Sequence, residues 1–222
     1  PYHEHKRGIR AGYAKFETFP IWNIPLKHPV NLAYEAATAD LNDVNMIDPF
    51  HLEAYGQTAV SYNRDVENYL LLNAVLELIY GENPYKSPTD MGVNMVGNCI
   101  VDDDVCIQAS NQEIIRRYYA ALERDYTDEG KREISKLELL MTQAKISTSD
   151  RKVTVAALER ATKSGIPSAA IELSDGKIIT SETSALLGIS AALLLDAVKY
   201  LAKTHDFKMI YVGDGDEKSK LK

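Results

Sequence analysis

The sequence predicts a mixed α/β protein in which a mainly helical first part is followed by a small α/β subdomain. Three observations predict this class. Apolar residues recur at helical spacing through most of residues 1–147. One segment near the start alternates with the period of a strand. Beyond it, a helix, a hairpin signal, a second helix and a last apolar strand follow in turn, so we predict domains at 1–147 and 148–222.

Prolines and glycines divide the first domain into its elements. Pro29 and Pro49 stand where a helix tolerates proline, in its first turn. Gly8, Gly56 and Gly81 stand where helices commonly end. The predicted elements are, in order, a helix end at 3–7, a strand at 12–19, and helices at 29–41, 49–55, 63–80, 102–124 and 134–144. Since apolar residues nearly encircle the 63–80 helix, we expect it to be buried, whereas polar residues predict linkers at 125–133 and 145–152.

The second domain has a clear hairpin signal. Asp175-Gly176 supplies the positive φ angles of a tight turn between strands at 168–173 and 177–181. A helix from Asp150 to Gly165 precedes the hairpin. A helix at 191–203 and a strand at 207–212 follow it. This order is typical of the cytidine-deaminase topology, which is an analogy of fold alone.

Zinc chemistry has no support in the sequence. A deaminase needs a His or Cys, with a Glu two residues on, where this helix begins Ser190-Ala191-Ala192, and a Pro-Cys-x-x-Cys after the last strand, where Gly213 and Asp214 stand. His3-Glu4-His5 lacks the spacing of a zinc protease, because position 7 is Arg. His51-x-Glu53 is a deaminase-like pair, but it has no cysteine partner. Cys99 and Cys106 are predicted to be buried small apolar residues. We therefore predict no zinc site and a structural or oligomerising role for the second domain.

Composition narrows the class of partner. The 222 residues carry a net charge of −7, and residues 1–110 hold 7 Lys/Arg against 15 Asp/Glu. An acidic chain repels phosphate backbones, so nucleic acid is disfavoured as a partner. The acidic half suits either a divalent cation or cationic ligand, or a solvated acidic surface. No stretch has the length of a membrane span, and two cysteines with a polar, basic start predict a cytoplasmic protein.

Polar residues gather in two regions that have neither the pattern of a helix surface nor that of loop filler. Between residues 13 and 65 they stand among prolines and aromatic residues, and a second such loop covers 86–92. Tyrosines, amides and carboxylates on rigid loops suit a small polar ligand. The alternative is a solvated, loop-rich surface whose polar side chains hydrogen-bond to backbone groups.

Several segments resemble a bacterial family that is catalogued as a domain of unknown function. The match is carried by residues 12–23 and 25–41, by the Asp-Pro-Phe-His-Leu-Glu-Ala-Tyr-Gly run within 43–56, and by the Lys-Ser-Pro-Thr-Asp-Met-Gly run within 85–94. It extends from Tyr2 to about Ala202, and the chain departs from the family's pattern after Asp206. Some members are described as ATP-dependent zinc proteases, a description for which this chain offers no ligand set.

The resemblance also implies what surrounds this chain. Full-length members look considerably longer and carry a strand and a Gly-rich, Lys-containing phosphate loop just upstream. Residues 3–7 then look like the end of the helix that follows that loop. Such a loop binds phosphate through backbone N–H groups. The resemblance therefore implies a nucleotide or phosphorylated ligand, with ATP and Mg²⁺ as cofactors of the full-length protein and none held within this chain.

We accordingly predict part of a nucleotide- or phosphometabolite-dependent enzyme for phosphoryl transfer or ligation. In that chemistry carboxylates hold Mg²⁺ and a cation holds the transferred group. The carboxylate candidates are Asp40, Asp43 and Asp48, and the cationic candidates are Lys15, Arg64 and Lys86. Lys15, Asp48 and Lys86 are the predicted catalytic residues, and we expect them to share one cleft. The predicted ligand-binding residues are Trp22, Tyr34, Asp40, Asp43, His51, Arg64 and Asp90. The alternatives are a metabolite-binding module and an assembly module whose 66–80 helix and second domain make subunit contacts.

Overall fold

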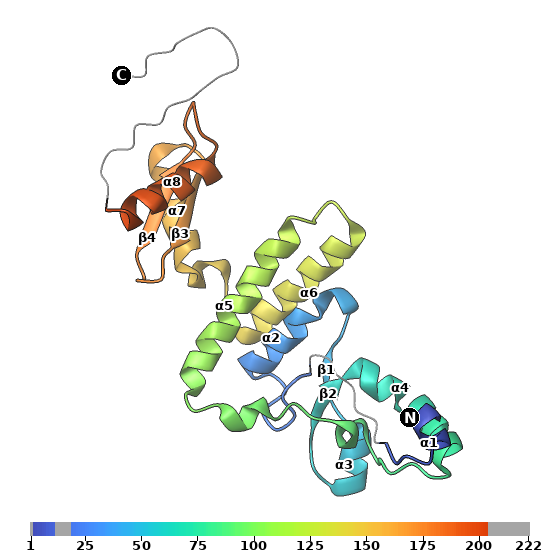
Figure 1. Cartoon of the computed structure of the whole chain (residues 1–222). Helices are drawn as coiled ribbons and strands as arrows, with labels where there is room; N and C mark the ends of the chain where they lie inside the picture. Colours follow the sequence, from blue (N-terminus) through green and yellow to red (C-terminus); the bar gives the residue numbers. More distant parts are fainter. Residues whose placement is uncertain (1, 12–18, 204–222) are drawn as a thin grey trace. The chain divides into compact units, whose positions relative to one another are not determined.

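The computed structural model describes residues 2–11 and 19–203 (Figure 1). The chain forms two compact units, Pro1–Asp150 and Arg151–Lys222. The α-helices of the first unit are α1 (Tyr2–Lys6), α2 (Pro29–Ala37), α3 (Pro49–Tyr55), α4 (Asn63–Tyr80), α5 (Asp103–Leu122) and α6 (Asp128–Ala144). Its strands are β1 (Asn45–Ile47) and β2 (Val60–Tyr62), and its 3-10 turns are η1 (Ala39–Leu41), η2 (Pro88–Met91), η3 (Met95–Cys99) and η4 (Thr148–Asp150).

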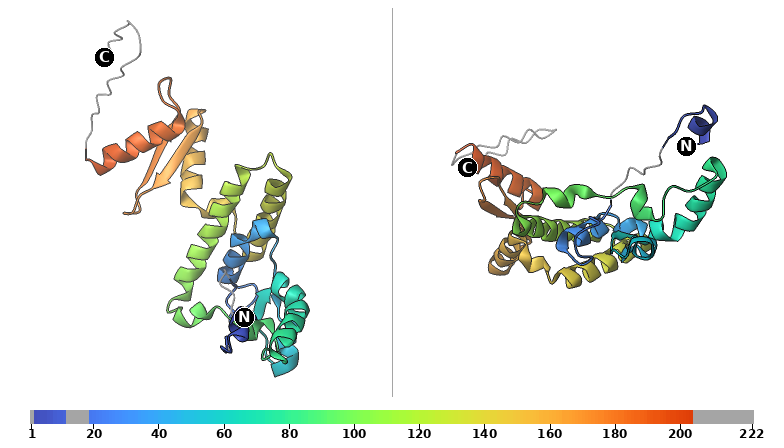
Figure 2. Two further views of the ribbon diagram at one scale, coloured as in Figure 1. Left: turned by 45° about the vertical axis from the view of Figure 1, so that its right-hand side comes forward. Right: turned by 90° about the horizontal axis from the view of Figure 1, so that it is seen from below.

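The largest core of the first unit lies between α2, α5 and α6, which run side by side in both figures of the whole chain (Figures 1 and 2). Its fully buried centre is apolar and comes from all three helices: Leu32, Ile114, Ile115, Leu137 and Leu140. A smaller cluster joins Tyr69 and Leu76 of α4 to Met91 of η2. The first unit therefore has a three-helix body and a second, smaller packing centre where α4 meets the loops.

Side-chain caps set the ends of α5 and α6. Asp102 Oδ1 accepts a hydrogen bond from Val105 N at 3.2 Å, as its place before a helix predicts. Thr127 Oγ1 accepts from Gly130 N at 2.9 Å, so α6 begins at Asp128. The predicted linker at 125–133 is therefore wrong over most of its length. A threonine cap in a polar segment starts the helix six residues before Ile134, the first of its large apolar side chains that packs against the core.

A two-stranded ribbon was not predicted. Strands β1 and β2 pair antiparallel, with Asn45 opposite Tyr62 and Ile47 opposite Val60. Each strand has three residues, which is too short for an alternating pattern to show. Because the strands are antiparallel, Asp48 after β1 donates to the carbonyl of Ala59 before β2, and Asn63 after β2 donates to the carbonyl of Val44 before β1. The ribbon therefore fixes the start of α3 at one of its ends and the start of α4 at the other.

Tyr62 of the ribbon gives a pH-dependent prediction. Its side chain is fully buried and donates to the carbonyl of Tyr34 at 3.0 Å. Burial raises the pKa of Tyr62 to about 12, whereas an unfolded tyrosine titrates near pH 10. The folded chain keeps this proton where the unfolded chain loses it, so the contribution is intact below pH 10 and is lost as the pH rises towards 12.

We therefore expect the free energy of unfolding to fall by about 2 to 3 kcal/mol through Tyr62 alone between these pH values. Urea unfolding at pH 9, 10, 11 and 12 measures it. Tyr62→Phe should have a shallower decline, and Tyr126→Phe, at a tyrosine that is 84% exposed, should follow the parent chain. Equal pH profiles for Tyr62→Phe and the parent would contradict the prediction.

The helix α3 confirms the local start and stop signals. Asp48 precedes it, Pro49 is its first residue, and Gly56 ends it at a φ of +66°. The helix α4 spans the predicted 63–80, with Gly81 at a φ of +81°.

The predicted burial of α4 is wrong. Leu70, Leu71 and Leu78 are 64%, 68% and 88% exposed. Only Tyr69 and Leu76 of this helix are buried. The described residues pack against one side of α4 and leave the other side exposed, although apolar residues nearly encircle this helix.

The second unit contains α7 (Lys152–Ser164), β3 (Ser168–Glu172), β4 (Ile178–Glu182) and α8 (Ile189–Leu201). The hairpin is confirmed: β3 and β4 pair antiparallel, and Gly176 has a φ of +80° in the turn. Both helices pack against the two strands. The α/β class is thus confirmed. The strands predicted at 12–19 and 207–212 fall largely or wholly outside the described residues, so the deaminase-like topology stays a prediction.

Two further features bear on the predictions. Cys99 is exposed and Cys106 is half-buried, so the expected burial of both cysteines is wrong. Cys99 ends the short turn η3, whose residues contribute nothing to the buried core. Among the helices of the described ranges, none has the length and apolar character to cross a bilayer.

Candidate functional site

The first candidate site lies where α3 meets the turn η2, and Asp48 is its buried centre. Asp48 has no exposed surface. Its Oδ1 accepts from Phe50 N at 3.0 Å and from His51 N at 3.1 Å. Its Oδ2 accepts from Thr89 N at 3.1 Å and from Thr89 Oγ1 at 2.6 Å. The carboxylate therefore caps α3 and joins it to η2, a loop about 40 residues further along the chain.

His51, Ser87 and Asp90 form a second layer that does not have the geometry of a nucleophilic triad. His51 Nδ1 lies 3.1 Å from Ser87 Oγ and 3.8 Å from Asp90 Oδ1. A triad needs the serine and the carboxylate on different ring nitrogens. Ser87 is also fully buried, and its Oγ accepts from Asp90 N at 3.2 Å. These contacts position the turn rather than activate a nucleophile.

Lys86 is the exposed cation of this cluster. Asp90 Oδ2 accepts from Lys86 N at 2.8 Å and from the Tyr55 hydroxyl at 2.9 Å. That second hydrogen bond raises the pKa of Tyr55 above its usual range. The Lys86 Nζ lies 5.7 Å from the centroid of the Tyr55 ring and forms no ion pair within the described residues. A fixed backbone thus presents a free ammonium group at the surface.

The other predicted site residues are spread over several environments. Asp43 is 1% exposed and accepts from Arg64 Nη2 at 3.1 Å, so these two predicted residues form a pair of their own. Asp40 is exposed on η1. Tyr34 and Trp22 are half-buried, and the backbone carbonyl of each accepts a hydrogen bond from β2. Lys15 lies outside the described residues, so the three-residue catalytic cleft stays a prediction.

The structure therefore brings together four predicted residues from two segments about 40 positions apart, namely Asp48 and His51 with Lys86 and Asp90. It does not gather the three carboxylates predicted for Mg²⁺. Asp40 is exposed, Asp43 is paired with Arg64, and Asp48 uses both oxygens within the fold. Within 2–11 and 19–203, no group of three or more His, Cys, Asp or Glu side chains could hold a metal ion.

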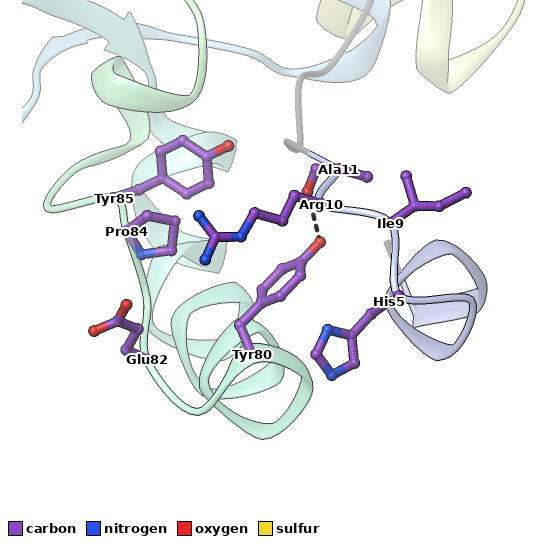
Figure 3. Close-up of a pocket in the computed structure, with 9 residues that line it drawn as sticks. His5, Ile9, Arg10, Ala11, Tyr80, Glu82, Pro84 and Tyr85 are labelled. Atoms are coloured by element: carbon purple, nitrogen blue, oxygen red, sulfur yellow. Dashed lines mark hydrogen bonds between the residues drawn. The ribbon is translucent and has the colours of Figure 1, made fainter.

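A second candidate site is a cavity of about 580 Å³ that is lined in part by Tyr85, the residue before Lys86 (Figure 3). It joins the end of α4 to the segment after α1, and its walls are His5, Gly8, Ile9, Arg10, Ala11, Tyr80, Glu82, Pro84 and Tyr85. The Tyr80 hydroxyl donates to the carbonyl of Ala11 at 2.7 Å, and the His5 ring stands edge-on to the Tyr80 ring at 5.3 Å. These contacts fix one aromatic wall.

Arg10 and Glu82 are the cationic and the anionic side chain in the lining of this cavity, and both are exposed. Figure 3 shows the Arg10 guanidinium reaching into the space between the Tyr80 and Tyr85 rings. The described residues include no ion pair of Arg10, and none links it to Glu82. Sequence analysis missed this site because its walls come from segments about 70 residues apart. The only local signal was a cation two residues after the glycine that ends α1.

Fold and site together define a mainly helical α/β protein with a tyrosine-walled, arginine-bearing cavity and a separate helix–hairpin–helix unit. Two family models cover almost the whole chain: "domain of unknown function DUF1846, N-terminal" matches residues 1–145, and its C-terminal counterpart matches 149–211. The chain belongs to the DUF1846 family, which confirms the resemblance drawn from the sequence.

Bacterial relatives are similar over nearly all of this chain. A "UPF0371 protein" of Corynebacterium urealyticum is 60% identical over 208 residues, which are 92% of this chain and 41% of that protein. Another from Streptococcus uberis is 57% identical over 217 residues, which are 95% of this chain and 44% of that protein. The chain thus spans about two fifths of the length of the curated relatives it matches, and none of these names states a function.

Proposed function

We propose that this chain is the part of a nucleotide- or phosphometabolite-dependent enzyme that binds the phosphorylated ligand. The observation that carries the proposal is the cavity in which Arg10 stands between Tyr80 and Tyr85 without a carboxylate partner among the described residues. A volume of about 580 Å³ falls within the range of small-molecule sites. The ligand would lie with a planar group against the tyrosines and its phosphate on Arg10.

The chemistry of the lining residues supports an anionic, partly planar ligand. A guanidinium presents a rigid fork of donors that fits two phosphate oxygens. Tyrosine rings offer flat apolar faces at little cost in side-chain entropy. Lys86 follows Tyr85 directly and supplies a second free cation on a fixed backbone.

Asp48 takes a positioning role in this proposal, because both its oxygens are engaged within the fold. Lys15 stays a predicted catalytic residue that lies outside the described residues.

We extend the proposal to the whole protein. Full-length members would hold ATP and Mg²⁺ with the help of the region upstream of this chain. That region of the same protein is therefore the first proposed partner of this chain. Both cysteines are free, which fits a reducing, cytoplasmic compartment where such ligands are abundant. Since the phosphate loop would belong to that upstream region, this chain alone should bind ATP only in the millimolar range.

Titration of the chain with Mg²⁺-ATP and with inorganic phosphate, followed by amide and tyrosine NMR shifts, tests the proposal. Both ligands should shift the amide resonances near Arg10. Mg²⁺-ATP, but not inorganic phosphate, should also shift the ring resonances of Tyr80 and Tyr85. Arg10→Met should weaken ATP binding by about tenfold or more, since a charge-assisted contact is lost. Lys86→Met should weaken it less.

The matched control is Lys131→Met, which removes an exposed lysine from α6 and should leave binding unchanged. No shift at either tyrosine with 10 mM ATP, or equal affinity for Arg10→Met and the parent, would refute the proposed ligand site. If Lys131→Met weakened ATP binding as much as Arg10→Met, the loss would come from the change in net charge alone. That result would also refute the proposed ligand site.

A further inference from the structure

The exposed side of α4 carries a row of large apolar side chains. Leu71, Val75 and Leu78 are spaced by four and three residues, so they lie on one face of the helix. They are 68%, 41% and 88% exposed, and Leu70 beside them is 64% exposed. We call these four residues the α4 apolar face. Scattered apolar residues on a surface are ordinary, but a contiguous row along an 18-residue helix marks an interaction surface.

The opposite side of α4 already has its partners. Tyr69 and Leu76 are buried, and they pack with Met91 of η2 and with Phe50 of α3. The Tyr69 and Phe50 ring centroids are 4.6 Å apart, and the Tyr69 hydroxyl donates to the Tyr85 carbonyl at 2.7 Å. The helix is therefore held in place by one side, and its apolar face is a fixed surface rather than the result of a loosely attached helix.

The apolar area of this face bears on which kind of partner can cover it. Four side chains at these exposures present roughly 400 Å² of apolar surface, close to the apolar share of the 800 Å² that each partner buries in a standard interface. The face is therefore large enough for a specific contact. A segment of the same polypeptide would cover it at a lower entropic cost than a separate protein, because a covalent link raises its effective concentration to about the millimolar range.

The family comparison supplies a segment of that kind. Relatives that are 57–60% identical to this chain extend well beyond it, since the matched region is only 41–44% of their length. We infer that the α4 apolar face is an intramolecular docking surface for the part of the longer family polypeptide that this chain does not include. The occupant presents an apolar helix or sheet face of matching width.

Cysteine labelling tests the inference in two forms of the protein: this chain alone, and this chain within a polypeptide of the relatives' full length. The background is Cys99→Ser/Cys106→Ser, and the probes are single Leu71→Cys and Leu78→Cys variants treated with a maleimide. Both probes should react rapidly in the chain alone and at least tenfold more slowly in the full-length form. Asp125→Cys, in the polar turn between α5 and α6, is the control and should react at one rate in both.

Three outcomes would overturn the inference. Equal rates in the two forms would mean that the face stays open in the longer polypeptide. Slow labelling in the dilute chain alone would mean that another part of this chain covers it. Labelling that slows with concentration, together with a dimer in sedimentation, would make a second copy the occupant.

A stability measurement keeps the inference testable even if the chain alone folds poorly. In the full-length form, Leu71→Glu/Leu78→Glu should lower the midpoint of thermal unfolding by several degrees, because it introduces two carboxylates into a buried contact. Glu67→Gln/Asn68→Glu, on an exposed polar part of the same helix, should leave the midpoint unchanged. An unchanged midpoint for the leucine double variant would count against the inference.

Discussion

Replacing Asp48 by alanine should lower the free energy of unfolding by about 3 to 5 kcal/mol, since it removes a buried acceptor and leaves its donors unsatisfied. The carboxylate accepts four hydrogen bonds, two from the start of α3 and two from Thr89. With the side chain gone, the backbone N–H groups of His51 and Thr89 lose their partners in a buried place. Urea unfolding monitored by circular dichroism measures the loss.

Two further variants separate the charge from the cap. Asp48→Asn keeps an acceptor for the start of α3 but turns an amide N–H₂ towards the donors of Thr89, so its loss should be intermediate. Asp40→Ala removes an exposed carboxylate from η1 and should change stability by less than about 0.5 kcal/mol. Asp48→Ala with the stability of Asp40→Ala would show that α3 and η2 hold together without this residue.

Local chemistry explains why the site was partly visible in the sequence. Asp48-Pro49 and Gly56 specify the start and end of α3 through contacts a few residues apart, so the sequence alone located them. The long-range hydrogen-bond partners of Asp48 and His51 could not be located in this way. Ser87 and Thr89 lie in the polar 86–92 loop that the sequence singles out, but nothing near them indicates that they meet His51 and Asp48.

The cavity and α4 show the same limit at longer range. Tyr80 and Ala11 meet across 69 positions, so the Arg10 cavity could not be derived from any local pattern. The apolar residues around α4 correctly indicated a helix whose sides favour burial. That pattern says which faces gain from cover, but not which segment of the polypeptide covers them. Leu78 is 88% exposed in the described residues, so its apolar character alone did not secure its burial.

The ion pair between Glu35 and Lys136 holds α2 to α6 and was not predicted either. Their side chains are 6% and 14% exposed, and Lys136 Nζ donates to Glu35 Oε1. Glu35 Oε2 also accepts from Asn45 N at 3.0 Å, so one carboxylate connects α2, α6 and the ribbon. A charge buried to this degree is stable only with its partner.

Replacing Lys136 by methionine should therefore lower the free energy of unfolding by about 3 to 5 kcal/mol, because Glu35 is left as a buried carboxylate without a counter-charge. Glu35→Gln/Lys136→Met should restore much of that loss, since the glutamine carbonyl can still accept from Asn45 N and no charge stays buried. Lys131→Met, at an exposed lysine five residues earlier in α6, should change stability by less than about 0.5 kcal/mol. A double variant less stable than Lys136→Met would mean that the carboxylate itself, rather than its pairing, stabilises the junction of α2, α6 and the ribbon.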